Sequence, residues 1–370
     1  MLLACVALAD RSLTVAARNP AADSRTIAAR WMKSMTLHDK VAQLIVIPFS
    51  GRTLNPRSRE FRNYVRLVGR IGVGGLILVN VHNGRIMPHA DPLAVASFLN
   101  KIQNVARIPL LVSGDFERGA SMRVDATTMF PHAMAFTAGR DPSAARYEGE
   151  VTAREARALG VHWVFFPVAD VNNNPDNPII NIRSFGENPQ DVAAYDSAFI
   201  EGAHSDPANL VLTTAKHFPG HGDTATDSHM NMVTITADRK RLSEVEFVPF
   251  RAAIEKGVDA VMTAHIAVPA LEEADVPATL SRVLLTDVLR EELGFKGIIV
   301  TDALEMHGIG NEFGVADAAV RSIEAGADVL LMPPDPEVAI NAVVAAVHAG
   351  RLTQKRIERS VMRVLSAKAK

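Results

Sequence analysis

The chain has 370 residues, of which 48% are hydrophobic and 22% are charged; these are ordinary values for a globular protein and exclude a disordered or fibrous chain. The formal net charge of -2 gives no electrostatic reason to expect nucleic acid or an anionic membrane as a partner. A single cysteine, Cys5, excludes an intrachain disulfide and a thiolate metal cluster.

The first residues are expected to lie outside the folded domain. Residues 1–9 are apolar and end in Ala7-Leu8-Ala9, like the last part of a signal peptide, although the basic region that should precede it is missing. A short disordered or helical segment is the alternative. Residues 10–24 indicate a tether, so we expect a tether or signal-peptide remnant at 1–24 and one domain at 25–370. The signal-like start favours export, with a cytoplasmic location as the alternative.

Short apolar runs rich in β-forming residues recur along the chain and predict eight strands. They lie at residues 41–49, 75–79, 109–115, 161–168, 210–215, 260–268, 297–301 and 327–332. Segments with helical periodicity separate them, at 91–106, 142–158, 190–203, 243–256, 281–293 and 315–325, and residues 335–370 continue as helices. Ser243-Glu244-Val245-Glu246 predicts a capping box. No apolar run is long enough to span a bilayer, so we expect no membrane span.

This order of elements predicts an α/β fold in which single helices connect parallel strands by right-handed crossovers. Eight such units can close into a (β/α)8 TIM-type barrel, here a single catalytic domain, whereas an open doubly wound sheet is the alternative. The barrel is favoured because polar residues follow several different strands rather than one switch point. These residues are Asp115, His217, His265 and Asp302.

The segment from Lys216 to His229 is the main candidate for a functional site, because its glycines make it a loop and titratable side chains are dense in it. Asp227 and His229 lie two positions apart, and a carboxylate bonded to an imidazole orients the ring and raises its basicity. Such a dyad can act as general acid and then as general base. The alternative makes Asp227 a loop cap and His229 a structural donor.

Asp302 follows the predicted strand 297–301, at the end where a barrel presents its reactive groups. A carboxylate facing a proton donor there fits a two-step displacement at an acetal carbon, with a covalent glycosyl intermediate on Asp302. The alternative is that Asp302 caps the following helix.

Other side chains at the predicted barrel mouth suit the binding of sugar hydroxyls. Asp115 is the preferred binding carboxylate, whereas for Glu117 pairing with Arg118 or Arg123 within its own loop is an equal alternative to binding sugar. Three basic residues can donate to hydroxyls or serve as structural ion-pair partners, and His265 faces the same mouth. The basic residues are Lys216, His217 and Arg183, the last on a long segment, 169–189, that indicates a site wall.

Together these motifs resemble family 3 glycoside hydrolases, and within them the β-N-acetylglucosaminidase (NagZ-like) branch. The similarity extends from about Ile27 onward. It is carried by Lys216-His217-Phe218-Pro219-Gly220-His221-Gly222-Asp223-Thr224, Asp227-Ser228-His229, Thr301-Asp302-Ala303-Leu304-Glu305-Met306, Arg183-Ser184-Phe185-Gly186 and Met35-Thr36-Leu37-His38-Asp39-Lys40-Val41-Ala42-Gln43-Leu44.

The resemblance implies a (β/α)8-type barrel that performs retaining hydrolysis with no metal or organic cofactor. It places Asp302 as the nucleophile and Asp227 with His229 as the acid/base dyad. The implied sugar-binding residues are Asp115, Arg183, Lys216 and His217, to which we add His265 and Met306. Family β-glucosidases take their acid/base glutamate from a second domain, which we do not expect in this chain.

One motif departs from the family pattern. Relatives read Asp-Gln-Glu-Gly-Gly after the third strand, whereas this chain reads Asp115-Phe116-Glu117-Arg118-Gly119. The aspartate is kept, but the change puts the packing of the loop and the shape of the subsite in doubt.

The first functional hypothesis is therefore a retaining exo-β-N-acetylglucosaminidase, a β-N-acetylhexosaminidase, acting on peptidoglycan fragments during recycling or on chitooligosaccharides. We expect a monomer with a carbohydrate substrate and no nucleic-acid partner. The alternatives are a non-catalytic glycan-binding barrel and a β-glucosidase or phosphorylase variant of the family. A phosphorylase is considered because a deprotonated histidine is neutral and repels phosphate less than a carboxylate does. A lyase or aldolase using Lys216 as a Schiff base is disfavoured because the last strands lack a glycine-rich phosphate loop.

Overall fold

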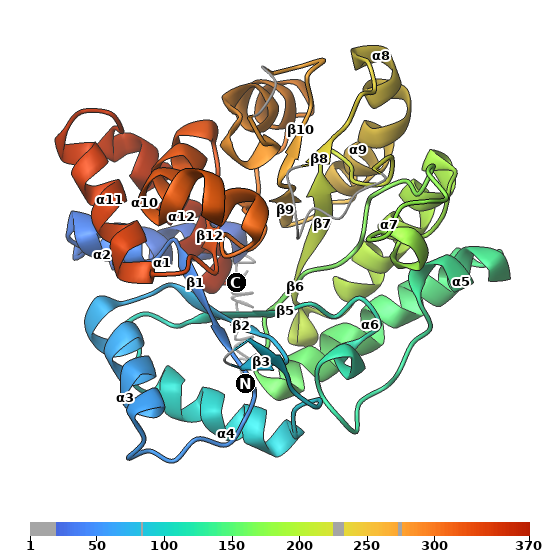
Figure 1. The fold of residues 1–370 in the computed structure, drawn as a ribbon. Helices are drawn as coiled ribbons and strands as arrows, with labels where there is room; N and C mark the ends of the chain where they lie inside the picture. The colour runs from blue at the N-terminus through green and yellow to red at the C-terminus, as the bar shows by residue number, and fades with distance from the viewer. Residues whose placement is uncertain (1–19, 83, 225–232, 273–275) are drawn as a thin grey trace, which may run out of the picture.

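A computed structural model describes residues 20–82, 84–224, 233–272 and 276–370. Its centre is a parallel sheet of eight strands in the order β11-β9-β7-β6-β5-β2-β1-β12 (Figure 1). A parallel bridge between Val300 and Val329 joins the two ends of this order and closes the sheet. The predicted (β/α)8 barrel is therefore confirmed. The strands are β1 (Ile45–Phe49), β2 (Gly75–Leu78), β5 (Leu111–Gly114), β6 (Trp163–Val164), β7 (Leu212–Phe218), β9 (Ala260–Thr263), β11 (Ile298–Val300) and β12 (Leu330–Leu331).

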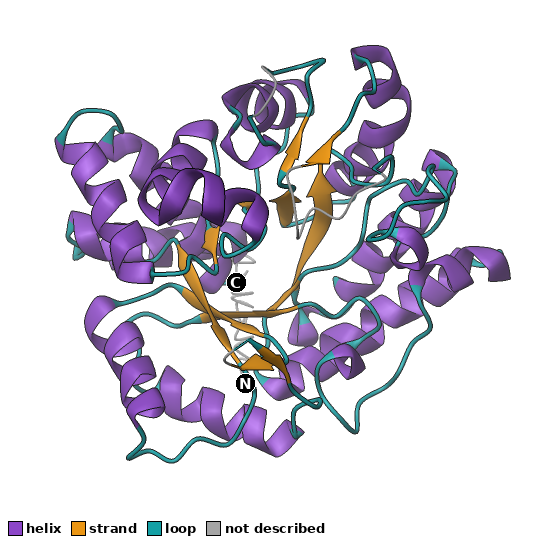
Figure 2. Ribbon diagram, viewed as in Figure 1, coloured by secondary structure: helices purple, strands orange, loops and turns teal. Residues whose placement is uncertain are grey.

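Helices surround the barrel, as Figure 2 shows. The longer ones are α1 (Pro20–Lys33), α4 (Pro92–Gln103), α6 (Pro142–Leu159), α7 (Pro189–Ala203), α9 (Phe247–Glu255), η7 (Val283–Glu292), α10 (His307–Ala325), α11 (Pro336–His348) and α12 (Gln354–Lys368). Shorter helical segments are α2 (Leu37–Ala42), α3 (Arg59–Val65), η1 (Arg66–Ile71), η2 (Ala120–Met122), α5 (Ala133–Gly139), η3 (Asn181–Arg183), η4 (Pro207–Asn209), α8 (Arg239–Arg241), η5 (Leu242–Glu246) and η6 (Ala278–Leu280).

Two small sheets lie outside the barrel order. β3 (Val81–His82) and β4 (Arg85–Ile86) form an antiparallel pair, and β8 (Val233–Thr234) and β10 (Ile266–Ala267) form a parallel pair. In the described ranges, no helix combines the length and the apolar character needed to cross a membrane.

Each predicted strand run overlaps a barrel strand, although β7 continues to Phe218, beyond the predicted run 210–215. Some other boundaries are wrong because helix caps override the apolar pattern. Thr36 accepts from the backbone N–H of Asp39 and forms a capping box with it, so α2 includes Val41 although the apolar run begins there. The prediction of a tether up to Ser24 is wrong for residues 20–24, which form the first turns of α1.

The predicted capping box at Ser243 is also wrong. The helical region begins at Arg239, where the Asp238 carboxylate accepts from the backbone N–H of Arg241 at 2.8 Å. Glu246 consequently lies two helical turns into the segment instead of at its start. The helix predicted from residue 315 starts at His307 and is interrupted at Gly314, which has φ +68°.

A cluster of charged side chains around the buried Asp328 links elements at the N-terminal ends of the barrel strands. Asp328 is fully buried just before β12 and accepts from the guanidinium groups of Arg290 and Arg363, the latter at 3.0 Å, and from the backbone N–H of Ile299 at 3.0 Å. Arg356 lies 3.8 Å away. Because burial disfavours the charged carboxylate while these arginines favour it, the net result is an Asp328 pKa below its usual value.

Candidate functional site

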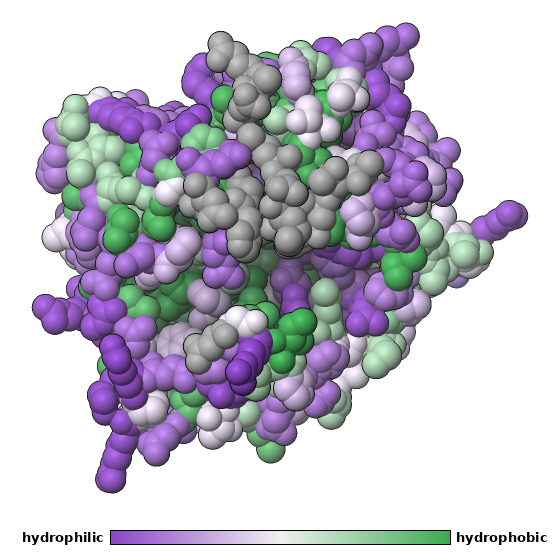
Figure 3. All heavy atoms as spheres, viewed as in Figure 1, coloured by the Kyte–Doolittle hydropathy of each residue, from purple (hydrophilic) through white to green (hydrophobic). Residues whose placement is uncertain are grey.

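The C-terminal ends of the strands open onto a pocket of about 260 Å3. Figure 3 shows this face of the molecule, which is hollowed near its centre where hydrophilic and hydrophobic surface adjoin. The pocket is lined by Asp115, Glu117, Met122, Arg123, Ile179, Arg183, Lys216, His217, His221, Met262 and Asp302. Five of the predicted site residues are therefore among its walls.

An ion cluster forms one side of the pocket. Lys216, at the end of β7, places Nζ 2.9 Å from Asp115 Oδ1 and 2.7 Å from Glu117 Oε1. Arg183 of η3 donates through Nε and Nη2 to the two oxygens of Glu117, at 2.9 and 2.8 Å, and Arg123 Nη2 lies 3.1 Å from Asp115 Oδ2. The alternative in which Glu117 pairs with Arg118 or Arg123 is therefore wrong: its partners are Lys216 of β7 and Arg183 of the long segment after β6.

The cluster keeps its members charged. Burial opposes ionisation of Glu117, but Arg183 and Lys216 outweigh it and hold the pKa of Glu117 well below its usual range. Burial likewise opposes the charge on Lys216, yet Asp115 and Glu117 raise its pKa above the ordinary value. A lysine held protonated in this way is a poor Schiff-base nucleophile, which argues further against an aldolase.

Asp170, the second residue after the predicted strand 161–168, orders the loop that follows β7. Its carboxylate is fully buried: Oδ2 lies 2.8 Å from His217 Nδ1, and Oδ1 accepts from the backbone N–H groups of His217 at 3.1 Å and His221 at 2.6 Å. The peptide bonds Lys216–His217 and Phe218–Pro219 are cis. Asp170 thereby fixes the ring of His217 at the pocket.

The long segment 169–189 is joined to the same loop. The amide of Asn177 donates to the carbonyl oxygens of His221 at 2.8 Å and Gly222 at 3.1 Å. A Cβ on Gly222 would lie 1.7 Å from the carbonyl oxygen of Val171, so only glycine fits this approach. The two walls of the pocket therefore hold each other in place.

Asp302 differs from the other pocket carboxylates. Its Oδ1 accepts from the backbone N–H of Ala303 at 2.7 Å, and no cation of the described residues lies within ion-pair distance of it. Burial opposes ionisation, but the imidazoles of His217 and His265 and the Ala303 N–H together keep the pKa of Asp302 below its usual value. Asp302 is thus a half-buried, ionised carboxylate whose oxygens can still accept further hydrogen bonds or attack a substrate.

The remaining predicted site residues have other positions. His265 is buried, with Nδ1 2.8 Å from Thr279 Oγ1 and Nε2 3.1 Å from the carbonyl oxygen of Ala303, so it supports the turn at Asp302. Met306 is half-buried at the N-cap of α10. In the described part of the chain, neither is a lining residue of the pocket. Asp227 and His229 lie outside the described residues.

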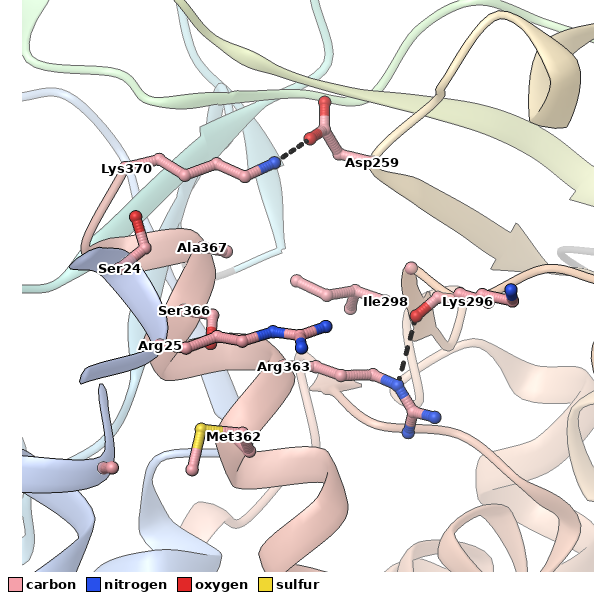
Figure 4. Close-up of a pocket in the computed structure, with 12 residues that line it drawn as sticks. Ser24, Arg25, Asp259, Lys296, Ile298, Met362, Arg363, Ser366, Ala367 and Lys370 are labelled. Atoms are coloured by element: carbon pink, nitrogen blue, oxygen red, sulfur yellow. Dashed lines mark hydrogen bonds and ion pairs between the residues drawn. The ribbon is translucent and has the colours of Figure 1, made fainter. Parts of the chain in front are cut away.

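A larger pocket, of about 610 Å3, lies at the opposite end of the barrel between α1, α12 and the start of β11. Its carboxylate among the described lining residues, Asp259, lies 2.9 Å from Lys370 Nζ (Figure 4). The same carboxylate lies 2.9 Å from His204 Nε2. Because the Asp259 carboxylate is already paired with two basic side chains and barrel enzymes have their active sites at the C-terminal ends of the strands, the 260 Å3 pocket is the better candidate for a functional site. No three His, Cys, Asp or Glu side chains within the described ranges are grouped as metal ligands.

The sequence profile described as "Glycosyl hydrolase family 3 N terminal domain" matches residues 36–367. The chain belongs to glycosyl hydrolase family 3.

Relatives within family 3 are named for action on amino sugars. "Beta-hexosaminidase A" of Pseudoalteromonas piscicida is 34% identical over 332 residues, which cover 82% of this chain and 54% of that protein. "Beta-N-acetylglucosaminidase/beta-glucosidase" of Cellulomonas fimi is 35% identical over 319 residues, which cover 84% of this chain and 54% of that protein. The chain thus spans about half the length of these curated relatives.

A solved family 3 β-N-acetylglucosaminidase from Paenibacillus sp. has a similar structure. It is 39% identical with a TM-score of 0.82, and the similarity covers 90% of this chain and 62% of that one.

Two buried carboxylates of the site have no predicted functional role. Glu117 had an equal chance of pairing within its own loop, although an acidic residue two positions after Asp115 returns to the same side of an extended segment. Asp170 follows directly on a continuous apolar run, the position at which strand-end chemistry is expected. That signal was available but was overshadowed by the longer loop after β7.

Proposed function

We propose that this family 3 chain is a retaining exo-β-N-acetylglucosaminidase whose nucleophile is Asp302. The observation that carries the proposal is the contrast among the pocket carboxylates. Asp115 and Glu117 are each held by two cations, whereas Asp302 is ionised and bonded to a backbone N–H. A carboxylate that must attack a sugar carbon needs a free lone pair and a negative charge, and Asp302 combines them.

The pocket favours binding of one terminal sugar. Its volume of about 260 Å3 is below the roughly 300–1,000 Å3 of pockets that hold drug-sized ligands. Charged donors and acceptors fixed by one another line it, which suits several hydroxyls on a single ring. In the proposal Asp115 accepts from hydroxyls, Arg183, Lys216 and His217 donate to them, and the leaving group lies outside the pocket.

The proposed reaction proceeds in two displacements. The Asp302 carboxylate attacks the anomeric carbon as the glycosidic bond breaks, and His229, oriented by Asp227, gives a proton to the departing oxygen. His229 then takes a proton from water, the water oxygen bonds to the same carbon, and Asp302 leaves. Two inversions give net retention. The roles of His229 and Asp227 rest on the sequence resemblance.

The loop after β5, residues 115–119, departs from the family pattern, but its structure does not favour the alternative of a non-catalytic glycan-binding barrel. Phe116 is fully buried and its ring packs near Gly114, while Asp115 and Glu117 on either side line the pocket. Phe116, which departs from the family pattern, is therefore accommodated in the hydrophobic core and leaves Asp115 and Glu117 at the pocket. We further propose that the folded domain begins with α1, at about residue 20, works as a monomer, and acts on peptidoglycan fragments or chitooligosaccharides.

The test compares aryl β-N-acetylglucosaminide with aryl β-glucoside as substrates for the wild type, Asp302→Ala and the control Asp176→Ala. Asp176 is exposed on the long segment 169–189. We expect turnover of the first substrate, its loss in Asp302→Ala and its retention in the control. A slow fluorinated substrate should also add one glycosyl mass to the wild type but not to Asp302→Ala. Turnover that survives Asp302→Ala would contradict the role of Asp302 as nucleophile. Turnover of the glucoside alone would contradict the proposed specificity for N-acetylglucosaminides.

A further inference from the structure

Glu246 lies behind the pocket, where it touches both loops that form the site. Its side chain is 1% exposed, and Oε1 accepts from Asn173 Nδ2 of the long segment at 3.3 Å. A Cβ built on Gly220, in the loop after β7, would lie 2.9 Å from the Cβ of Glu246, so the stem of Glu246 packs against that loop. Gly220 has φ +127°, which further limits the position to glycine.

The polar groups around Glu246 are incompletely bonded. Arg241 Nη2 lies 3.7 Å from Glu246 Oε1 and 3.9 Å from Asp223 Oδ2. Within the described part of the chain, four buried atoms here lack a hydrogen-bond partner. They are Oε2 of Glu246, Nε of Arg241, Oδ1 of Asn172 and Oδ1 of Asn173. A buried network with unmet bonds is sensitive to a change of charge within it.

The charges that face Glu246 make such a change occur near neutral pH. Burial raises the pKa of Glu246 to about 7; Arg241 and the Asn173 amide lower it, and the negative charges of Asp223 and Asp170 raise it. Asp170 is the carboxylate that holds His217 and His221. A negative Glu246 therefore repels the group that orders the pocket loop.

We propose that Glu246 is a positioning residue for this site: in its neutral form it packs against Gly220 and leaves the loop after β7 ordered by Asp170, and in its ionised form it repels Asp170 and loosens that loop. This inference rests on the proposed function, because its main readout is turnover. It gives a role to a glutamate whose sequence context indicated only a helix cap.

The experiment uses Glu246→Gln, which keeps the shape and the bond from Asn173 but cannot ionise. The readout is kcat/KM between pH 6 and pH 8 on an aryl β-N-acetylglucosaminide whose leaving group needs no protonation, so that the acid/base dyad does not shape the profile. We expect the wild type to fall about tenfold over this range, as one ionisation near pH 7 dictates, and Glu246→Gln to change less than about twofold.

The matched control is Glu244→Gln, because Glu244 is exposed on the same segment and faces Lys240 at 3.9 Å. It should keep the wild-type profile. A second variant, Arg241→Gln, removes the cation that lowers the pKa of Glu246 and should move the wild-type fall to higher pH. A flat wild-type profile, or a Glu246→Gln profile that falls like the wild type, overturns the proposal.

Unfolding by urea at pH 6 and pH 8 separates failure of this inference from failure of the proposed function. Because the pKa of Glu246 is raised in the folded state, its ionisation should lower the wild-type urea midpoint as pH rises through about 7, and Glu246→Gln should lack this part of the decline. If no substrate is turned over, the proposed function fails, and equal declines in both proteins would still overturn the titration of Glu246. If the urea midpoints of the wild type and Glu246→Gln respond differently to pH but their profiles of kcat/KM against pH are the same, the positioning role is overturned.

Discussion

The ion cluster of the pocket makes a quantitative prediction for Glu117→Gln. Glu117 is 5% exposed and accepts from Lys216 Nζ and from two nitrogens of Arg183. Gln removes the charge and one of the two acceptors, which leaves Arg183 without its bidentate partner in a buried site. Breaking one side of a buried ion pair costs about 3–5 kcal/mol, a large fraction of the roughly 5–15 kcal/mol by which a domain is stable.

The assay is urea unfolding followed by tryptophan fluorescence, because Trp163 is fully buried in β6 against Phe165. The control is Glu150→Gln, which breaks the surface pair with Arg146 and should cost less than about 1 kcal/mol. Since the folded-state pKa of Glu117 is depressed, its contribution is present above the unfolded pKa and is lost as pH falls through the folded value. The difference in the free energy of unfolding between the wild type and Glu117→Gln should therefore become smaller below about pH 4.5. A cost no larger than that of the control, or a gap unchanged by acid, would refute the reasoning.

Three further variants test other parts of the structure. Asp328→Asn should lower the free energy of unfolding by about 3–5 kcal/mol in a denaturant titration, because it leaves three partly buried arginines without the buried carboxylate that they share; a loss under 1 kcal/mol would contradict this. Asp196 is fully buried with both oxygens unpartnered among the described residues, and its pKa is raised well above the usual value by burial first and then by Asp170. The stability that neutral Asp196 contributes is lost as pH rises through its folded-state pKa. The melting temperature of Asp196→Asn should therefore rise relative to that of the wild type toward pH 8. A difference in melting temperature that does not change with pH would contradict the raised pKa of Asp196. Gly222→Ala forces the loop away from Val171, so kcat/KM should fall by about 100-fold, and near-normal turnover would show that the contact is dispensable.

The strands of this barrel could be predicted because each is a short continuous apolar run, as buried parallel strands are. The errors came where a local signal competes with that pattern. The Thr36 cap extends α2 into residues that read as strand, and Asp238 starts a helix before the apparent capping box at Ser243. Side-chain capping bonds decide such boundaries, and their geometry is not visible in hydrophobic periodicity.

Much of the pocket could also be predicted, because the C-terminal ends of parallel strands meet at one face. Asp115, Lys216 and Asp302 follow three different strands and line one pocket. The partner of Glu117 could not be predicted in the same way. Arg183 lies 66 positions further along the chain, and its pairing depends on how two loops meet after the barrel has closed. Charge pairing within the loop was one alternative for Glu117 and was wrong.

The two ends of the described chain interlock, and this constrains how the protein is made. α1 packs on α12, Ser24 bonds to the carbonyl oxygen of Ala369, and Lys40 pairs with Glu358 at 2.7 Å, while β1 pairs with β12. On the ribosome, β1 and α1 emerge well before their partners β12 and α12. Through most of synthesis the edge of β1 is therefore an open template for wrong pairing, and chaperone protection of the nascent chain should matter more for this barrel than for a protein with sequence-local contacts.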